Sequence, residues 1–224
     1  LHTTLLASGK IVDVSKEIKG RTIFLNASSD NARIEDLLRL AVKSDEPLMT
    51  GSANLKTTID VPEGADDFLD RMKLVGAFGV GNAQFTSATV QGKVDTLSRK
   101  GQGKPKDTDI SEVASDLRGN FRLANAVVTF SSLSFAVEGA SVHLDGTYNI
   151  DSTAMDFSGD LLMQAKLSQT TTGAKSFFLK AADPFFRGKH GGSDVPIKIG
   201  GTKDHPTFGL GKRGGNKQAE APGK

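Results

Sequence analysis

Apolar and polar residues alternate along the C-terminal half of the chain, most clearly in residues 154–167. Phe157 and Leu161 fall in one phase of this alternation, whereas Asp156 and Asp160 fall in the other. A β-strand sends successive side chains to opposite faces, so this spacing predicts a strand with one apolar and one polar face.

The same alternation appears in residues 142–150, and a short polar connection that includes Asp151 and Ser152 separates the two segments. Such a connection predicts a β-hairpin. Further strands are predicted around residues 22–25, 55–61, 121–127, 133–137, 195–199 and 208–210. Buried parallel strands would be continuous apolar runs, so the alternation indicates an antiparallel meander with one apolar face.

Helical spacing of apolar residues is confined largely to the first half of the chain. Residues 34–42 predict an amphipathic helix, residues 66–72 a short helix, and residues 90–97 a third one. The predicted fold class is therefore mainly β with a minor α component, in which two or three short helices lie at the periphery.

Changes in composition along the chain predict four parts. Residues 1–98 form a mixed β and helical part, and residues 99–117 form a loop or linker rich in Lys, Gly and Asp. Residues 118–210 form the antiparallel meander, and residues 211–224 form a disordered basic tail rich in Gly and Lys.

One motif occurs twice, in Gly76–Thr86 and in Gly119–Thr129, with the shared pattern G-x-F-x-[VL]-x-N-A-x-[FV]-T. The repetition predicts the same strand–turn–strand unit in both places. The turn is expected at Asn82 and Asn125, because Asn tolerates the left-handed backbone conformation.

Composition excludes several classes of protein. The net charge of +2 over 224 residues is too small to favour nucleic acid as a partner. The absence of Cys excludes disulfides, thiolate metal sites and Cys nucleophiles. No stretch approaches the roughly 18 apolar residues that a membrane span needs. A first residue other than Met predicts an excised fragment, with any targeting segment or anchor outside it.

Candidate chemistry is sparse. Gly76–Gly81 has the glycines in the wrong order for a dinucleotide fingerprint and is better explained by a Gly-rich β turn. The four histidines lack metal-ligand spacing, and His143 falls on the polar phase of a strand. The carboxylates of Asp66–Asp67 and Asp107–Asp109 fit helix caps and solvated loops. Without a G-x-S-x-G elbow, we expect no enzyme, no cofactor and no metal.

Four stretches carry a resemblance to a known family by their order along the chain. They are Ile34–Leu38 leading to Leu48–Gly51, the two G-x-F units, Val142–Ile150 continuing to Met155–Gly159, and Val195–Thr202 with Pro206–Leu210. Together they resemble the C-terminal region of the AsmA-like family of bacterial envelope proteins, which are bridge-like lipid-transfer proteins.

The resemblance implies an elongated, twisted antiparallel sheet curled around an apolar groove. It also implies a non-catalytic periplasmic module that binds or conducts phospholipid acyl chains and supports outer-membrane assembly and lipid homeostasis. The parent protein would be anchored in the inner membrane by an N-terminal helix absent here. Envelope proteins are further expected partners, and the end from Arg187 onward, where Lys and Arg outnumber acids, could contact anionic head groups.

The residues expected to line the groove are the apolar phase of the predicted C-terminal strands. They are Phe121, Leu123, Val142, Leu144, Tyr148, Ile150, Met155, Phe157, Leu161, Met163 and Leu167. The alternative is a structural or protein-interaction β domain in which these side chains form a closed core. Whether protein covers the apolar phase is what separates the two hypotheses.

Overall fold

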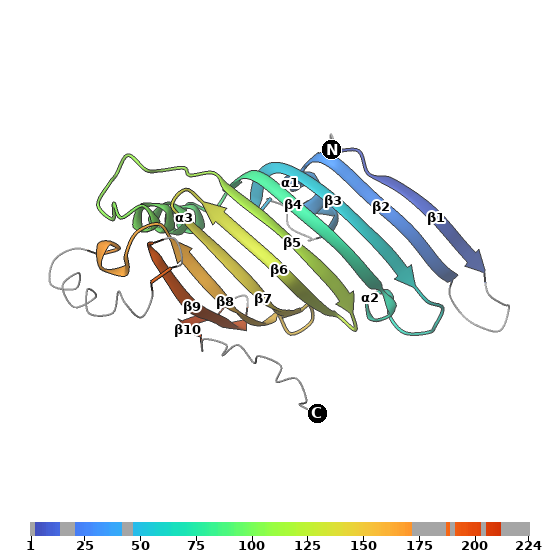
Figure 1. The fold of residues 1–224 in the computed structure, drawn as a ribbon. Helices are drawn as coiled ribbons and strands as arrows, with labels where there is room; N and C mark the ends of the chain where they lie inside the picture. Colours follow the sequence, from blue (N-terminus) through green and yellow to red (C-terminus); the bar gives the residue numbers. More distant parts are fainter. Residues whose placement is uncertain are drawn as a thin grey trace, which may run out of the picture.

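The computed structural model describes residues 3–13, 21–41, 47–171, 187–188, 191–202 and 205–211. These residues form one ten-stranded sheet in which each strand pairs with the next along the chain (Figure 1). The strands are β1 (Leu6–Asp13), β2 (Arg21–Arg33), β3 (Met49–Val61), β4 (Lys73–Phe85), β5 (Ser115–Ala124), β6 (Val127–Val137), β7 (Ala140–Asn149), β8 (Ala154–Met163), β9 (Ser193–Thr202) and β10 (Pro206–Leu210). All neighbouring pairs are antiparallel, which confirms the predicted meander.

The described helical segments are two longer helices and two single turns. They are α1 (Ile34–Ala41), α2 (Phe68–Arg71), α3 (Ala88–Gly101) and the 3-10 turn η1 (Leu167–Gln169). The α-helices all lie in the first half of the chain, as the spacing predicted. The segment that joins α3 to β5 runs over residues 102–114, and the strands before and after it belong to the same sheet.

The pairing register places one phase of every strand on a common face. In β7 and β8, Val142 pairs with Leu161 and Tyr148 pairs with Met155, as expected for the predicted hairpin. Because paired residues in a sheet share a face, the predicted apolar phase of this hairpin is confirmed. The same rule extends the face across the whole sheet, and we call it the apolar face.

Four phenylalanines cross the middle of the apolar face in a row. The ring centroids of Phe78 and Phe121 are 6.2 Å apart, those of Phe78 and Phe130 are 6.4 Å apart, and those of Phe130 and Phe157 are 5.9 Å apart. Offset and tilted rings at these separations attract one another beyond the apolar area that they bury.

Glycines in neighbouring strands make room for these rings. The two copies of the G-x-F motif pair with each other, so that Phe78 of β4 lies opposite Gly119 and Phe121 of β5 lies opposite Gly76. Gly146 of β7 lies opposite Phe130 on one side and Phe157 on the other. A Cβ atom at Gly146 would lie 2.6 Å from Cδ1 of Phe157, so a larger residue would displace the ring.

The repeated motif therefore has a different role from the predicted one. Asn82 and Asn125 both have the predicted left-handed backbone, with φ of 52° and 50°. Asn125 does lie in the turn between β5 and β6, but Asn82 lies at an irregularity inside β4. A β-bulge also takes one residue out of register, which is why the same Asn chemistry serves both positions.

Two further expectations were wrong at the ends of strands. The alternation continues to Leu167, but β8 ends at Met163 and Leu167 begins η1. Ile150 lies one residue beyond β7, where its N–H donates to the carbonyl of Ala126. The strand β1 was not predicted, because LASGKIVD does not alternate; its partner β2 supplies the pairing that holds it in the sheet.

Both longer helices pack on the apolar face at one end of the strands. Ile34 and Leu37 of α1 lie against a buried cluster of β-strand residues, namely Ala32, Ala53, Val80 and Ala83. Leu97 of α3 lies against a second cluster, which contains Ala140, Met163 and Val195. The two clusters belong to the ends of the strands that meet on the same side in Figure 1.

Candidate functional site

The apolar face is the most distinctive surface of the described protein because it carries no charge over most of its width. By the pairing register, none of the residues that β3–β10 place on this face is Asp, Glu, Lys, Arg or His. Most of the large side chains on it are partly buried, and Phe208 and Leu210 of β10 are each 71% exposed. Ten strands at about 4.8 Å spacing make this face roughly 45 Å across.

The opposite face is polar, as the alternation predicted. Its charges include Lys56, Arg118, Arg122, Asp156 and Lys198. Asp156 and Lys198 form an ion pair of 3.3 Å with both side chains more than half exposed, so the pair contributes little to stability. Across β3–β10, charge is thus segregated to one side of the sheet, whereas Asp13 and Arg21 of the β1–β2 pair fall in the apolar phase.

The structure places the predicted groove residues in two environments. Phe121, Leu144, Tyr148 and Met155 lie along the apolar face and are partly buried. Val142 lies there too, and Leu123 and Phe157 are buried within it, 3% and 9% exposed. Leu161, Met163 and Leu167 belong instead to the cluster that α3 covers. Ile150 stands outside the face, in the turn after β7.

Sequence reasoning missed the half of the apolar face that precedes β5, and also Phe130 in β6. β2, β3 and β4 contribute Leu25, Ile59, Leu74 and Phe78 to this face. The G-x-F spacing was the signal that could have found Phe78, because residues i and i+2 of a strand share a face. Reading the motif as a turn concealed that relation.

A hollow of about 420 Å³ lies between α1 and the apolar face. Ile34, Leu37 and Leu38 of α1 form one side, and Met49 and Leu55 of β3 belong to the other. Phe78 and Phe121 of the phenylalanine row also line it, so the hollow is continuous with the row. Asn54 is the single polar residue in its lining.

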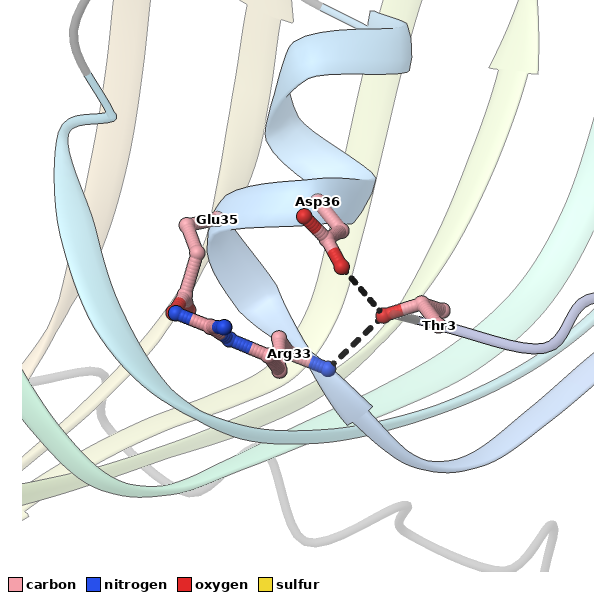
Figure 2. A network of polar contacts seen from close by, with 4 residues as sticks. All are labelled: Thr3, Arg33, Glu35 and Asp36. Carbon is pink, nitrogen blue, oxygen red and sulfur yellow. Dashed lines mark hydrogen bonds and ion pairs between the residues drawn. The ribbon is translucent and has the colours of Figure 1, made fainter. Parts of the chain in front are cut away.

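A polar cluster holds the first turn of α1 in place, as Figure 2 shows. The Thr3 hydroxyl donates to Oδ2 of Asp36 at 3.0 Å and accepts from the backbone N–H of Arg33 at 3.0 Å. The guanidinium of Arg33 pairs with Oε1 of Glu35, with a closest distance of 2.6 Å. These contacts tie the N-terminal segment, the end of β2 and α1 together.

The carboxylate of Glu35 remains charged although the residue is only 8% exposed. Burial raises the pKa of Glu35, but its own backbone N–H, the Arg33 guanidinium and the N–H of Gly51 together outweigh burial and hold the pKa below its ordinary value. Acidic residues in the first turn also interact favourably with the helix dipole. The cluster is therefore a structural anchor for α1 rather than an acid–base pair.

Other candidate chemistry from the sequence has no support in the geometry. His143 is exposed on the polar face opposite Asp160. Within the described ranges, no group of three or more His, Asp or Glu residues could hold a metal ion. His2, His190 and most of the basic C-terminal end lie outside the described residues.

None of the helices in the part of the chain that the structure describes is long and apolar enough to cross a membrane. The fold and its surface define a protein with one open antiparallel sheet, one face of which is apolar. Comparison with family models, with curated proteins and with solved structures finds no match to this chain.

Proposed function

We propose that this chain is a non-catalytic module that shelters lipid acyl chains on its apolar face. The observation that carries the proposal is the absence of charged side chains from that face across β3–β10. An apolar surface of this extent on one side of a sheet marks an interaction site for apolar material.

The energetics favour acyl chains as the ligand. Burying one CH₂ group stabilises the complex by about 0.8 kcal/mol, so ten sheltered groups contribute about 8 kcal/mol before entropic costs. The charged or polar head group would stay at the rim, in water, so that no buried counter-ion is required. A curled sheet would turn the apolar face into a groove along which chains could move.

The AsmA-like resemblance supports a periplasmic location for this activity, within a parent protein of the inner membrane that supports outer-membrane assembly. In this proposal the chain lowers the cost of moving acyl chains through an aqueous space and catalyses no reaction. Phospholipids are its ligands, and other envelope proteins are its further partners.

Photo-crosslinking in cells tests the proposal with matched neighbours. A crosslinking residue at Leu144 or Met155 faces the apolar side, whereas one at His143 or Asp156 faces the polar side one residue away. Lipid adducts from the first pair and none from the second are expected. Adducts to protein alone from Leu144 and Met155 would show a closed core, and the module would then be structural.

A further inference from the structure

We infer that the hollow beside α1 is a terminal subsite that receives the methyl end of a single acyl chain. The inference rests on the proposed function, because Phe78 and Phe121 of the apolar face also line the hollow. The proposed function has acyl chains lying along the apolar face, and the subsite is the position where the end of one chain is held.

The size of the hollow fits one chain. A dry cavity of about 150 Å³ lined by aliphatic and aromatic side chains holds one benzene molecule. At that packing, a hollow of about 420 Å³ admits at most about 17 carbon atoms. One long acyl chain fills such a volume, and a phospholipid with two chains exceeds it.

The chemistry of the lining selects the tail of the ligand over its head. No titratable side chain lines the hollow. The charged groups near the first turn of α1 do not line the hollow: Arg33 pairs with Oε1 of Glu35, whose buried Oε2 has no hydrogen-bond partner, and Asp36 accepts from Thr3. A head group brought inside would lose its water without gaining a partner, so the methyl end enters and the head group remains outside.

Small residues keep the hollow open. Ala53 of β3 is 2% exposed and lines the space with a single methyl group. A leucine there would add three carbons on the side that faces α1, whereas Thr50 of the same strand lies on the polar face and is exposed. Ala53→Leu and Thr50→Leu are therefore matched variants that fill and spare the hollow.

The experiment is a competition assay with the purified chain, in which saturated fatty acids of increasing length displace a fluorescent acyl probe. Affinity should rise about fourfold with each methylene until the subsite is full and then nearly level off, because further methylenes lie on the open face and keep part of their contact with water. Ala53→Leu should lower the length at which affinity levels off by about three carbons, in proportion to the volume that it removes. Thr50→Leu should leave that length unchanged.

A second variant guards against misfolding of Ala53→Leu. Leu38→Trp enlarges a partly exposed side chain of α1 that lines the hollow. It should also lower the chain length at which affinity levels off. Unchanged profiles in folded Ala53→Leu and Leu38→Trp overturn the subsite.

The two proposals fail separately. Lipid crosslinks from Leu144 and Met155 together with unchanged length profiles would leave the apolar face as a lipid surface without this subsite. A shortened profile without crosslinks at Leu144 and Met155 would leave a single-chain pocket on a protein that is no conduit.

Discussion

The two longer helices lie on the same face and at the same end of the sheet, yet they are held there by different contacts. α3 is fastened by polar groups: Ser98 is fully buried and its hydroxyl donates to the carbonyl of Glu138 at 2.8 Å. Among the described residues, α1 has such polar contacts only at its first turn, and the rest of the helix lies through Ile34 and Leu37 against three alanines and Val80, with the hollow beside it. The α3 contacts define one position closely, whereas the α1 contacts leave an apolar hollow beside the helix.

The sequences of the helices agree with this difference. The buried residues of α3 include Asp95, Ser98 and Gly101. The packing of this helix on the sheet therefore depends on hydrogen bonds and on the close approach of its backbone to that of Gly139. The lining side of α1 is aliphatic, and its polar groups are gathered at the first turn, where Thr3 reaches them.

The largest effect is expected from a substitution at Gly101, where α3 closely approaches the backbone of Gly139. A Cβ atom there would lie 2.5 Å from the carbonyl oxygen of Gly139 and 2.8 Å from Cβ of Ala140. Because the nearest atoms are backbone atoms, Gly101→Ala should lower the free energy of unfolding by about 3 kcal/mol. Urea denaturation monitored by circular dichroism measures the change.

Gly92 of the same helix is the matched control, since a Cβ atom there would meet nothing within 4 Å. Gly92→Ala should raise the free energy of unfolding by up to about 1 kcal/mol, because Ala restricts the unfolded chain and favours the helix. Similar losses of stability in both variants would show that α3 does not approach β7 as described.

The next largest effect is expected from removing the two hydrogen bonds that the Ser98 hydroxyl makes. Ser98→Ala leaves the carbonyl of Glu138 and the side-chain amide of Gln102 without the Ser98 hydroxyl, and should cost about 2 kcal/mol. Ser98→Cys retains a weak donor of similar size and should cost less. If the alanine variant unfolds at the same urea concentration as the wild type, then polar contacts do not hold α3.

A third prediction uses pH to separate charge from shape at Asp95. Its Oδ1 accepts from the backbone N–H of Val113 at 3.0 Å and from the amide of Gln91 at 2.9 Å. Burial raises the pKa of Asp95, but these bonds, the N–H of Glu112 and the charge of Arg99 outweigh it, so the pKa lies below its ordinary value.

The contribution of Asp95 to stability depends on pH. A carboxyl whose pKa is lower in the folded state stabilises the protein above its unfolded pKa of about 3.9, and the contribution is lost as pH falls through the folded value. Asp95→Asn keeps an acceptor for Val113 but not the charge, so it should cost about 1 kcal/mol at pH 7 and progressively less below pH 4. A constant difference between pH 7 and pH 3 would contradict the charged role.

The sequence predicted those features of the comparison that depend on one element alone, including α3, which the spacing of residues 90–97 indicated. The spacing of residues 34–42 indicated α1, and the alternation of β7 and β8 fixed which side chains share a face. Both signals are local, since they depend on the period of one element. The structure confirms them with small errors at strand ends, such as Leu167.

What could not be predicted depends on contacts between distant elements. The pairing of Phe78 with Gly119 requires the register of β4 against β5, and the motif alone does not supply it. The hollow forms because α1 lies over Ala53, and the spacing of apolar residues in the helix does not predict where the helix lies on the sheet. β1 lacks a pattern of its own and is a strand because β2 offers it a partner.

The smallest effect tests the anchor of α1. Thr3 accepts from the N–H of Arg33 and donates to Asp36, and Thr3→Val replaces the hydroxyl by a methyl group of similar size. Both bonds lie at a partly exposed site where water can replace the lost partner, so the cost should be about 0.5–1 kcal/mol, with Thr3→Ser close to the wild type. Because the loss acts on the first turn of α1 alone, hydrogen exchange of the α1 amides should quicken about two- to fivefold while the α3 amides keep their rates. Equal acceleration in both helices would mean that α1 and α3 open together, and the distinction between a helix with polar contacts along its buried side and a helix with polar contacts at its first turn alone would then be lost.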